Sequence, residues 1–556
     1  MRWVWLCLLS FLPASAAATG YADLGKLERE AVDDALALRG LTIEPDPQGK
    51  TIAEVHVVNL DVFLARERLP LLWANVFHRT TREHHILRES LLQAGDLYDQ
   101  DRVEETVRNL QNPLFSNVVV VLPVRSALPE RVDLLIVTRD VWSLRFNQDY
   151  EAGQGQLLYY TGSLSENNLF GWRKQVAVVF VMDQGEMAFG PHYIDPNILG
   201  SRLRLSAAFS WIWAREIGQI AAGPREGTSS RFSLEYPFWS LARRWGASAA
   251  FGHYDGVIRR FLGTELRPVS LDNAAAVPWM YHQRSLSSAE SVTRSFPTPS
   301  VIQRVSLGHE FSLVRPTFTP DFPYPEGSAE RDQFAQKAFP PSERLSGVYL
   351  SYELFTPRYR IYRDFNTFDF REDMRLGPWL WLKAGRASGA LGSERDFTLF
   401  QTSFDVASDW LAGVQSMGVS WESRLQDNGE VTDQLVRGRF VLASPVFGGA
   451  FVPPPVRVGL TVILALLLLP VVPMPARSWN SVATMPRSWR RAPISISPCG
   501  GSPSPRWARR GSAAPASGAC SSSRPSPRSS RRVWSRPTDK SASATRSTTR
   551  RSWDRW

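Results

Sequence analysis

Histidine is the side chain in this sequence best suited to acid–base or metal chemistry, and its only close grouping is His84-His85, flanked by Glu83 and Glu89. Zinc takes histidine and carboxylate ligands, but no third ligand follows this pair at metal-binding spacing. The pattern therefore favours a solvated helix face and predicts no metal site. The other six histidines are scattered along the chain: His56, His78, His192, His253, His282 and His309.

The sequence also lacks the motifs of common enzymes. It contains no recognisable Ser/His/Asp arrangement, paired-carboxylate constellation, Walker loop or dinucleotide fingerprint. Its three cysteines are Cys7, Cys499 and Cys520, so residues 19–475 hold neither a disulfide framework nor a cysteine-based metal site. We therefore expect a protein that is not an enzyme, with no catalytic residues and no cofactor.

Charge is distributed unevenly along the chain. The net charge of +10 arises in residues 476–556, which carry 17 Lys/Arg and 2 Asp/Glu, whereas the remainder has a net charge of −5. Because the body offers no basic patch, we do not expect nucleic acid to be its partner.

The N-terminus is typical of an exported protein. Arg2 precedes an apolar run over residues 3–12, and the small residues from Ala14 to Ala18 supply A-x-A cleavage sites. The run is too short to span about 30 Å of hydrocarbon, so the pattern predicts a signal peptide over residues 1–18 rather than a membrane anchor.

The sequence predicts a helix followed by a linker over residues 19–50. A small α/β domain is expected over residues 51–145. The expected order in the domain is one strand, two helices and two strands. Thr80-x-x-Glu83 is a capping box that would open the first helix, and Asp99 can cap the second. The strands are expected over 52–63, 117–124 and 132–142.

From about residue 150 to residue 450, apolar and polar residues alternate with a period of two. One such stretch places these residues on a single face: Leu203, Leu205, Ala207, Phe209, Trp211 and Trp213. Aromatic residues such as Trp379 and Trp381 lie at strand ends. A soluble β-sandwich also alternates, but the strand-end aromatics and the length favour strands that cross a membrane, with one face on lipid and the other in a wet interior.

A turn-rich stretch over residues 162–175 opens this region. It places Asn167-Asn168 and Gly171 between two strand-like flanks, 157–164 and 174–183. Its sequence, Ser-Leu-Ser-Glu-Asn-Asn-Leu-Phe-Gly, and its position resemble the first hairpin of the Omp85 outer-membrane barrels (BamA/TamA type, "surface antigen D15"). The preceding unit resembles a POTRA domain in its order of elements and in Gly95-x-x-Tyr98-x-x-x-x-Val103.

The resemblance implies an all-β transmembrane barrel, of about sixteen strands in that family, in the bacterial outer membrane, preceded by a POTRA-like α/β domain in the periplasm. In that family the first and last strands pair weakly, and a client strand can enter the seam. The resemblance places the first strand of this seam at Leu157, Tyr159, Tyr160, Gly162 and Leu164.

The function that the resemblance implies is the insertion of outer-membrane proteins. Its partners would be the outer-membrane bilayer, unfolded β-barrel clients or a secreted polypeptide, and periplasmic accessory proteins. A two-partner-secretion translocator, a lipid exporter and a passive outer-membrane pore stay open as alternatives. A secreted soluble β-protein with a nucleic-acid-binding tail is a further one.

The alternation stops after Gly449. Residues 458–472 are almost continuously aliphatic, and the sequence beyond them is rich in Arg, Ser, Pro, Ala and Trp. A membrane helix with a basic tail, or a disordered basic arm, would fit this composition. We favour a frameshift over residues 451–556, because a GC-rich gene translated out of frame gives this mixture, and the last barrel strands would then be missing. The string from Val436 to Phe440 shares letters with the family's Arg-Gly-aromatic motif, but its alternation predicts an ordinary strand.

Overall fold

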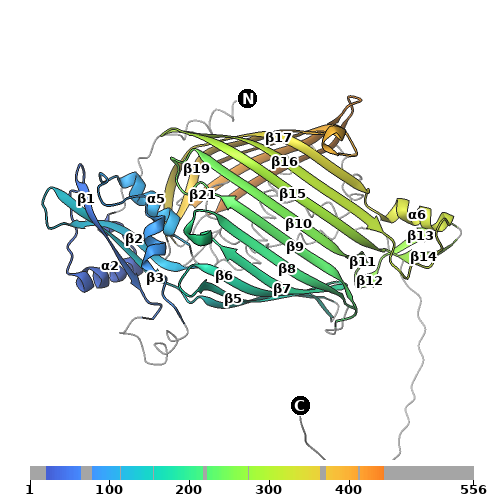
Figure 1. The fold of residues 1–556 in the computed structure, drawn as a ribbon, viewed down its shortest axis with the longest axis horizontal. Coiled ribbons are helices and arrows are strands. Elements are labelled where there is room, and N and C mark those ends of the chain that lie inside the picture. Colours follow the sequence, from blue (N-terminus) through green and yellow to red (C-terminus); the bar gives the residue numbers. More distant parts are fainter. Residues whose placement is uncertain are drawn as a thin grey trace, which may run out of the picture. The chain divides into compact units, whose positions relative to one another are not determined.

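The computed structural model describes residues 20–63, 78–112, 114–153, 156–216, 222–272, 274–363, 371–410 and 413–443. The predicted signal peptide over 1–18 and the predicted aberrant tail over 451–556 lie outside the described residues. Within the described residues, a small α/β unit precedes a large antiparallel sheet (Figure 1). None of the described helices has the length and hydropathy needed to cross a membrane.

The α/β unit has the predicted order of one strand, two helices and two strands, preceded by an N-terminal helix. Its elements are η1 (Tyr21–Asp23), α2 (Lys26–Arg39), β1 (Thr51–Leu60), α4 (Glu83–Glu89), α5 (Gln100–Leu110), β2 (Ser116–Arg125) and β3 (Arg131–Asp140). The strand order is β1-β3-β2, with β1 parallel and β2 antiparallel to the central β3.

Alternate residues of β3 face two separate hydrophobic cores. Leu134 and Ile136 pack with α4 and α5 on one face, whereas Leu135 and Val137 pack with α2 on the other. The N-terminal helix is therefore part of the α/β unit, because its buried Val32 completes the second core.

The first predicted capping box is wrong, and the second predicted cap is confirmed. Asp99 accepts hydrogen bonds from the backbone N–H groups of Asp101 and Arg102 and so begins α5. In contrast, α4 is only 7 residues long, its N-cap is Arg82, and no side chain caps it. Thr80 does not cap this helix, because its carbonyl lies against Gly171 of the large sheet.

The large sheet runs in chain order along a single path from β4 to β22, with β18 beside β19. Its strands are β4 (Leu144–Gly153), β5 (Gln156–Leu169), β6 (Lys174–Asp183), β7 (Glu186–Asp195), β8 (Arg204–Ala214), β9 (Arg225–Tyr236), β10 (Trp245–Arg259), β15 (Met280–Pro297), β16 (Ile302–Thr317), β17 (Glu343–Phe355), β18 (Arg358–Arg363), β19 (Arg371–Ala387), β20 (Phe397–Trp410), β21 (Gly413–Gln426) and β22 (Val431–Ala443).

The connections of the large sheet hold short additional elements. These are η3 (Ile198–Gly200), β11 (Phe261–Leu262), β12 (Glu265–Leu266), β13 (Pro268–Leu271), β14 (Ala274–Pro278), α6 (Ala329–Ala338) and η4 (Gly389–Leu391). The β13–β14 hairpin and α6 share a small hydrophobic cluster around Phe334.

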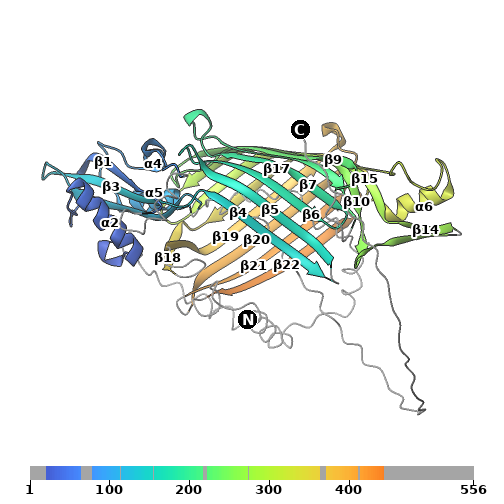
Figure 2. The same ribbon diagram turned by 90° about the horizontal axis from the view of Figure 1, so that it is seen from below.

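The sheet curls round on itself into a barrel-like form (Figure 1 and Figure 2). The predicted fold class, a barrel-like all-β sheet preceded by a small α/β unit, is confirmed. The region after residue 443, where the sequence analysis expects the last strands of the barrel to be missing, falls outside the described residues.

The two faces of the curled sheet differ in chemistry. One face, called the outer face below, exposes large apolar side chains such as Phe189, Leu307 and Leu350. The opposite, inner face carries paired charges. Arg304 contacts Glu353 at 3.3 Å, and Lys383 contacts Glu310 at 2.6 Å.

Two of the aromatic residues expected at the membrane interface face inward instead. The indole N–H of Trp379 donates to the carboxylate of Glu353 at 2.8 Å, and Trp381 lies on the same face of β19 as Trp379. The expectation that both tryptophans lie at a strand end is also wrong, because they are in the middle of β19 (Arg371–Ala387), where the register places Trp381 opposite Glu353. Their positions in the strand therefore fix both rings on the inner face.

Replacing Ile136 with alanine should destabilise the α/β unit by about 2–5 kcal/mol, because Ile136 is fully buried in β3 and the change leaves a cavity. Proteolysis of the full chain across a urea series measures the effect. The exposed Leu128, changed to alanine, is the matched control. Equal susceptibility of the two variants would contradict the packing described.

Candidate functional site

The N-terminal edge of the large sheet is the strand β4. It is hydrogen-bonded to β5 in antiparallel register, with Phe146 opposite Leu164 and Tyr150 opposite Tyr160. Among the described residues no strand pairs with its other side. Phe146 and Tyr150 are 63% and 67% exposed on the outer face, so β4 presents both an open backbone edge and exposed aromatic rings.

The residues predicted to form the first strand lie one strand further in. Leu157, Tyr159, Tyr160, Gly162 and Leu164 all belong to β5, which is hydrogen-bonded to β4 on one side and to β6 on the other. The first strand is therefore β4, which the sequence analysis did not identify as a strand. Entry of a client at this edge stays a prediction.

The sequence of β4 explains why it was missed. Between Phe146 and Tyr150 it carries Asn147, Gln148 and Asp149, which are polar residues with low strand propensity. The remaining signal is the pair of aromatics four residues apart on one face, with Gln148 midway between them. That signal is too sparse to distinguish a strand from a linker by periodicity alone.

The other end of the described sheet is β22, which contains the string from Val436 to Phe440 as the ordinary strand expected. Val436 and Phe440 are exposed on the outer face. On the inner face Arg439 contacts the carboxylate of Asp405 at 2.7 Å. No described strand pairs with the far side of β22.

The turn between β5 and β6 joins the large sheet to the α/β unit, and Asn168 is its central contact. The side-chain N–H₂ of Asn168 donates to the carbonyl of Arg79 at 2.9 Å and to the hydroxyl of Thr81 at 3.1 Å. Its side-chain oxygen accepts from the backbone N–H of Arg173 at 2.9 Å. One buried amide thus holds the turn and the start of α4 together.

Gly171 allows the two parts to approach closely. Its φ of +75° lies in the left-handed region, and a Cβ there would come within 2.4 Å of the Thr80 carbonyl oxygen. The carbonyl of Gly171 also accepts from the backbone N–H of Arg82 at 3.0 Å. Only glycine fits this position without moving the backbone.

The same turn buries a charged side chain. Arg173 is 5% exposed, has a φ of 55°, and its guanidinium lies 5.5 Å from the centre of the Phe115 ring. Burial lowers the pKa of Arg173, and this is opposed by the charges of Glu89 and Asp140. A buried arginine in a left-handed turn is costly and marks this joint as tightly specified.

Asn167 connects the joint to the edge strand. Both its backbone N–H and its side-chain N–H₂ donate to the carbonyl of Ser143, at 3.0 and 2.9 Å. Because Ser143 immediately precedes β4, the start of the edge strand is fixed to the same turn.

Three buried polar side chains lie beside this joint. The His78 ring is 3.3 Å from the Ser143 hydroxyl through Nδ1 and 3.3 Å from the Asp140 carboxylate through Nε2. Asp140 also accepts from the backbone N–H of Thr81 at 2.6 Å. The residue types match a Ser/His/Asp triad, which the sequence spacing did not indicate. However, all three side chains are buried. Their contacts link the end of β3 to the segment before α4.

Three further contacts connect the α/β unit to turns of the large sheet. Asn109 donates to the carbonyl of Trp239 at 2.8 Å, Arg202 pairs with Glu89 at 3.0 Å, and Glu105 accepts from the backbone N–H of Leu241. Burial raises the pKa of Glu105, against the opposing hydrogen bond from Leu241. The α/β unit is thus held at the β7–β8 and β9–β10 turns as well.

The expectation of a solvated helix face at His84-His85 is half wrong. His84 is exposed, but His85 is only 8% exposed and its Nδ1 has no hydrogen-bond partner. Burial lowers the pKa of His85 to about 4, and the charges of His84 and Arg88 act in the same direction. The described residues contain no cluster of three metal-ligating side chains.

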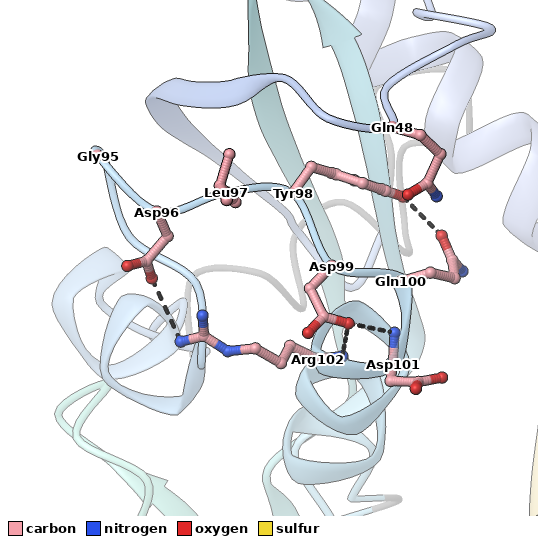
Figure 3. A pocket seen from close by; sticks show the side chains of 9 residues that line it. All are labelled: Gln48, Gly95, Asp96, Leu97, Tyr98, Asp99, Gln100, Asp101 and Arg102. Carbon is pink, nitrogen blue, oxygen red and sulfur yellow. Dashed lines mark hydrogen bonds and ion pairs between the residues drawn. The ribbon is translucent and has the colours of Figure 1, made fainter.

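A polar cavity of about 650 Å³ lies on the α/β unit, lined by residues 95–102 and Gln48 (Figure 3). Two of its three carboxylates are engaged: Asp99 caps α5 and Asp96 pairs with Arg102 at 3.2 Å. The segment around Leu97 bridges to Thr51 at the edge of β1, and Ile43 bridges to Val124 at the edge of β2. Both edges of the small sheet are therefore partly covered.

Comparisons with known proteins give only distant matches. No family model and no curated protein matches the chain. Among solved structures, it is similar to BamA from Haemophilus ducreyi lacking POTRA domains 1–3, with 11% identity, a TM-score of 0.31, and coverage of 74% of this chain and 92% of that chain.

Two further solved structures are similar. CdiB from Acinetobacter baumannii gives 12% identity, a TM-score of 0.26, and coverage of 75% and 78%. CdiB from Escherichia coli gives 10% identity, a TM-score of 0.31, and coverage of 77% of this chain and 96% of that chain. TM-scores of this size do not establish a common family.

Replacing Asn168 with alanine should loosen the joint, because it leaves the Arg79 carbonyl and the Arg173 N–H without their partner. A buried group that loses its hydrogen bond costs about 1–3 kcal/mol. We expect amide hydrogen exchange at Thr81 and Arg82 in the full chain to accelerate by about tenfold or more. The exposed turn residue Asn428, changed to alanine, should leave these amides unaffected. Unchanged exchange in the Asn168 variant would rule out this role.

Acid should destabilise the α/β unit through His85. Between pH 6.5 and about 4 the unfolded chain binds a proton at His85 that the folded chain excludes, so stability is full above pH 6.5 and falls as the pH drops towards 4. The slope is at most about 1.4 kcal/mol per pH unit. Urea unfolding at pH 7 and pH 5 should show a smaller difference for His85→Gln than for the parent or for His84→Gln. An identical pH dependence in all three would refute the assignment.

Proposed function

We propose that this chain is an outer-membrane barrel of the Omp85 type that handles unfolded β-barrel clients. The α/β unit acts in the periplasm, and a client strand pairs with the open edge of β4. The observation that carries this proposal is the contrast between β4 and β5. The joint fixes the β5–β6 turn through Asn168. In contrast, the backbone edge of β4 that points away from β5 has no described strand partner.

The length and the faces of β4 suit this role. Its 10 residues match the roughly 9–11 that a tilted strand needs to cross a bilayer. Phe146 and Tyr150 are on the side that faces lipid, and Asp149 and Glu151 are on the side that faces the interior. A guest strand beside β4 would continue both the apolar outer face and the polar inner face.

Backbone energetics favour this edge over those of the small sheet. An unpaired N–H or C=O group in hydrocarbon costs several kcal/mol, because no water is present to bond with it. A client strand relieves this cost along the whole of β4. The edges of β1 and β2 are in water and are partly covered by the segments around Leu97 and Ile43, so less is gained by pairing there.

The role requires no chemical catalysis. Strand pairing relies on backbone groups, and the buried His78, Asp140 and Ser143 support the joint without access to a substrate. We therefore propose a non-enzymatic activity in which the fixed α/β unit delivers a client to the adjacent edge.

Photo-cross-linking tests the proposal. The full chain, with a photoreactive phenylalanine analogue at Phe146, is reconstituted in phospholipid vesicles and given a urea-unfolded eight-stranded barrel as client. We expect the client to cross-link at Phe146, and its folding, followed by heat-modifiable gel mobility, to accelerate. The analogue at Phe189, which is exposed on the outer face of the internal strand β7, is the control.

Equal cross-linking at both positions, or none at Phe146, would contradict pairing at β4. Solute permeability of the vesicles with no effect on client folding would indicate a passive pore instead. Cross-linking followed by release of the client into the vesicle lumen would indicate a translocator.

A further inference from the structure

The outer face carries a groove at the middle of the sheet, far along the strand order from β4. The groove has a volume of about 400 Å³ and crosses β9, β10, β15 and β16. Its floor is formed by Ala247 and Ala249 of β10. Its walls carry larger side chains on the same face: Leu203, Leu234, Tyr236, Val292 and Leu307.

The strand register produces this groove. Ala247 lies between Tyr236 and Val292 in the ladder, and Ala249 lies between Leu234 and Glu290. Directly opposed residues in antiparallel strands share a face, so two small side chains follow one another between taller neighbours. The hollow is therefore specified by the sequence of β10.

An aromatic and basic pair lies just beyond the groove, at the end nearest the α/β unit. Trp245 precedes Ala247 by two residues on the same face, is 54% exposed, and lies opposite Arg294. The guanidinium of Arg294 is 4.7 Å from the Trp245 ring centre. Tryptophan with arginine at a strand end is the pattern of a lipid headgroup interface.

The other end of the groove is polar. His309 Nδ1 is 3.2 Å from the Glu290 carboxylate, and His309 Nε2 is 2.9 Å from the Ser346 hydroxyl. Ionisable groups on the lipid-facing surface of a barrel are costly, and mutual pairing reduces this cost. The apolar section thus lies between Arg294 and Glu290.

The length of this section is within the reach of one acyl chain in a single leaflet of a membrane. Arg294 and Glu290 are four residues apart on β15, which is about 14 Å along a strand at roughly 3.4 Å per residue. Because barrel strands are tilted by about 35–45°, this corresponds to a depth of about 10 Å, or roughly two-thirds of one leaflet of a hydrocarbon core about 30 Å thick. A lipid chain anchored at the interface has this reach.

From this geometry we infer that the groove binds one acyl chain of a glycerophospholipid, whose phosphate is held by Arg294. The inference rests on the membrane location proposed above. Arginine donates to phosphate oxygens in a bidentate manner, and the volume lies within the range of about 300–1,000 Å³ that is common for small-ligand sites.

A membrane helix of a partner is too wide for this groove. The walls on β9 and β15 are two strand spacings apart, about 9.6 Å between backbones, and their side chains narrow the space further. A helix with side chains measures about 10–12 Å across. An extended hydrocarbon chain fits between these walls.

Filling the groove is the main test. The full chain is reconstituted in vesicles containing phosphatidylethanolamine with a diazirine at the end of one acyl chain, and labelled peptides are mapped by mass spectrometry. We expect preferential labelling of the β15 and β16 peptides near Glu290 and His309. Ala249→Phe should reduce this labelling by about fivefold or more, whereas Ala384→Phe, on the exposed outer face of β19, should leave it unchanged.

Removing the phosphate contact is the second test. We expect the parent to be labelled several-fold more by the phospholipid than by a diacylglycerol carrying the same chain. Arg294→Gln should abolish this preference and Arg294→Lys should retain most of it. Equal labelling by both lipids in the parent would overturn the headgroup assignment.

The outcomes separate this inference from the proposed function. Even labelling of the outer face, without preference for the groove, would refute the lipid site while leaving the barrel in the membrane. No labelling anywhere, including around Leu350, would refute the membrane location itself. Chain-to-chain cross-links at Ala249 would show that a second copy occupies the groove, and would also refute the lipid site.

Discussion

The turn at residues 168–173 is the contact on which the rest of the structure depends. Asn168 bonds to the segment before α4, and the close approach of Gly171 to Thr80 allows no larger side chain. Asn167, the preceding residue, holds Ser143 just before β4 begins. The α/β unit, the second strand and the root of the edge strand therefore meet at one turn. Any movement of the α/β unit must be transmitted to the beginning of the sheet, because the connection is a set of buried hydrogen bonds and not a linker.

Features governed by local chemistry could be predicted from the sequence. The helix α5 begins where Asp99 caps it, and β6 has the predicted bounds because its alternation and its flanking turns agree. Features governed by distant partners could not. Thr80 has the sequence of a helix cap but lies against Gly171, and His85 looks solvated on its own helix but is buried in the fold. The strand β4 was missed because only Phe146 and Tyr150 mark its outer face, with Gln148 between them, so its period-two signal is weak.

The same period-two pattern meets two opposite requirements in the large sheet. In the membrane location proposed above, outward positions need apolar side chains against lipid, whereas inward positions accept polar and charged side chains, and buried charges there need partners. Arg304 and Glu353 form an ion pair on the inner face, and the indole N–H of Trp379 donates to the same carboxylate. Which aromatic residues form a girdle is thus decided by partners on neighbouring strands. Knowledge of the register, which sequence patterning does not supply, was needed to separate Trp379 from Trp245.

The size and polarity of the side chains on the outer face vary around the sheet, and this variation connects the two proposed sites. At β4 the outer face is interrupted by Gln148 between its two aromatics, whereas at β10 it is hollowed by Ala247 and Ala249 and bordered by the Trp245–Arg294 pair. A lipid seated in the groove would replace the missing apolar bulk and hold the middle of the sheet firmly in the membrane. The edge has no such anchor. Its backbone N–H and C=O groups have no hydrogen-bond partners in the hydrocarbon until another strand pairs with them. If the middle of the sheet is held by lipid and the unpaired edge carries a free-energy cost, pairing of a guest strand at β4 is favoured over separation of strands elsewhere in the sheet.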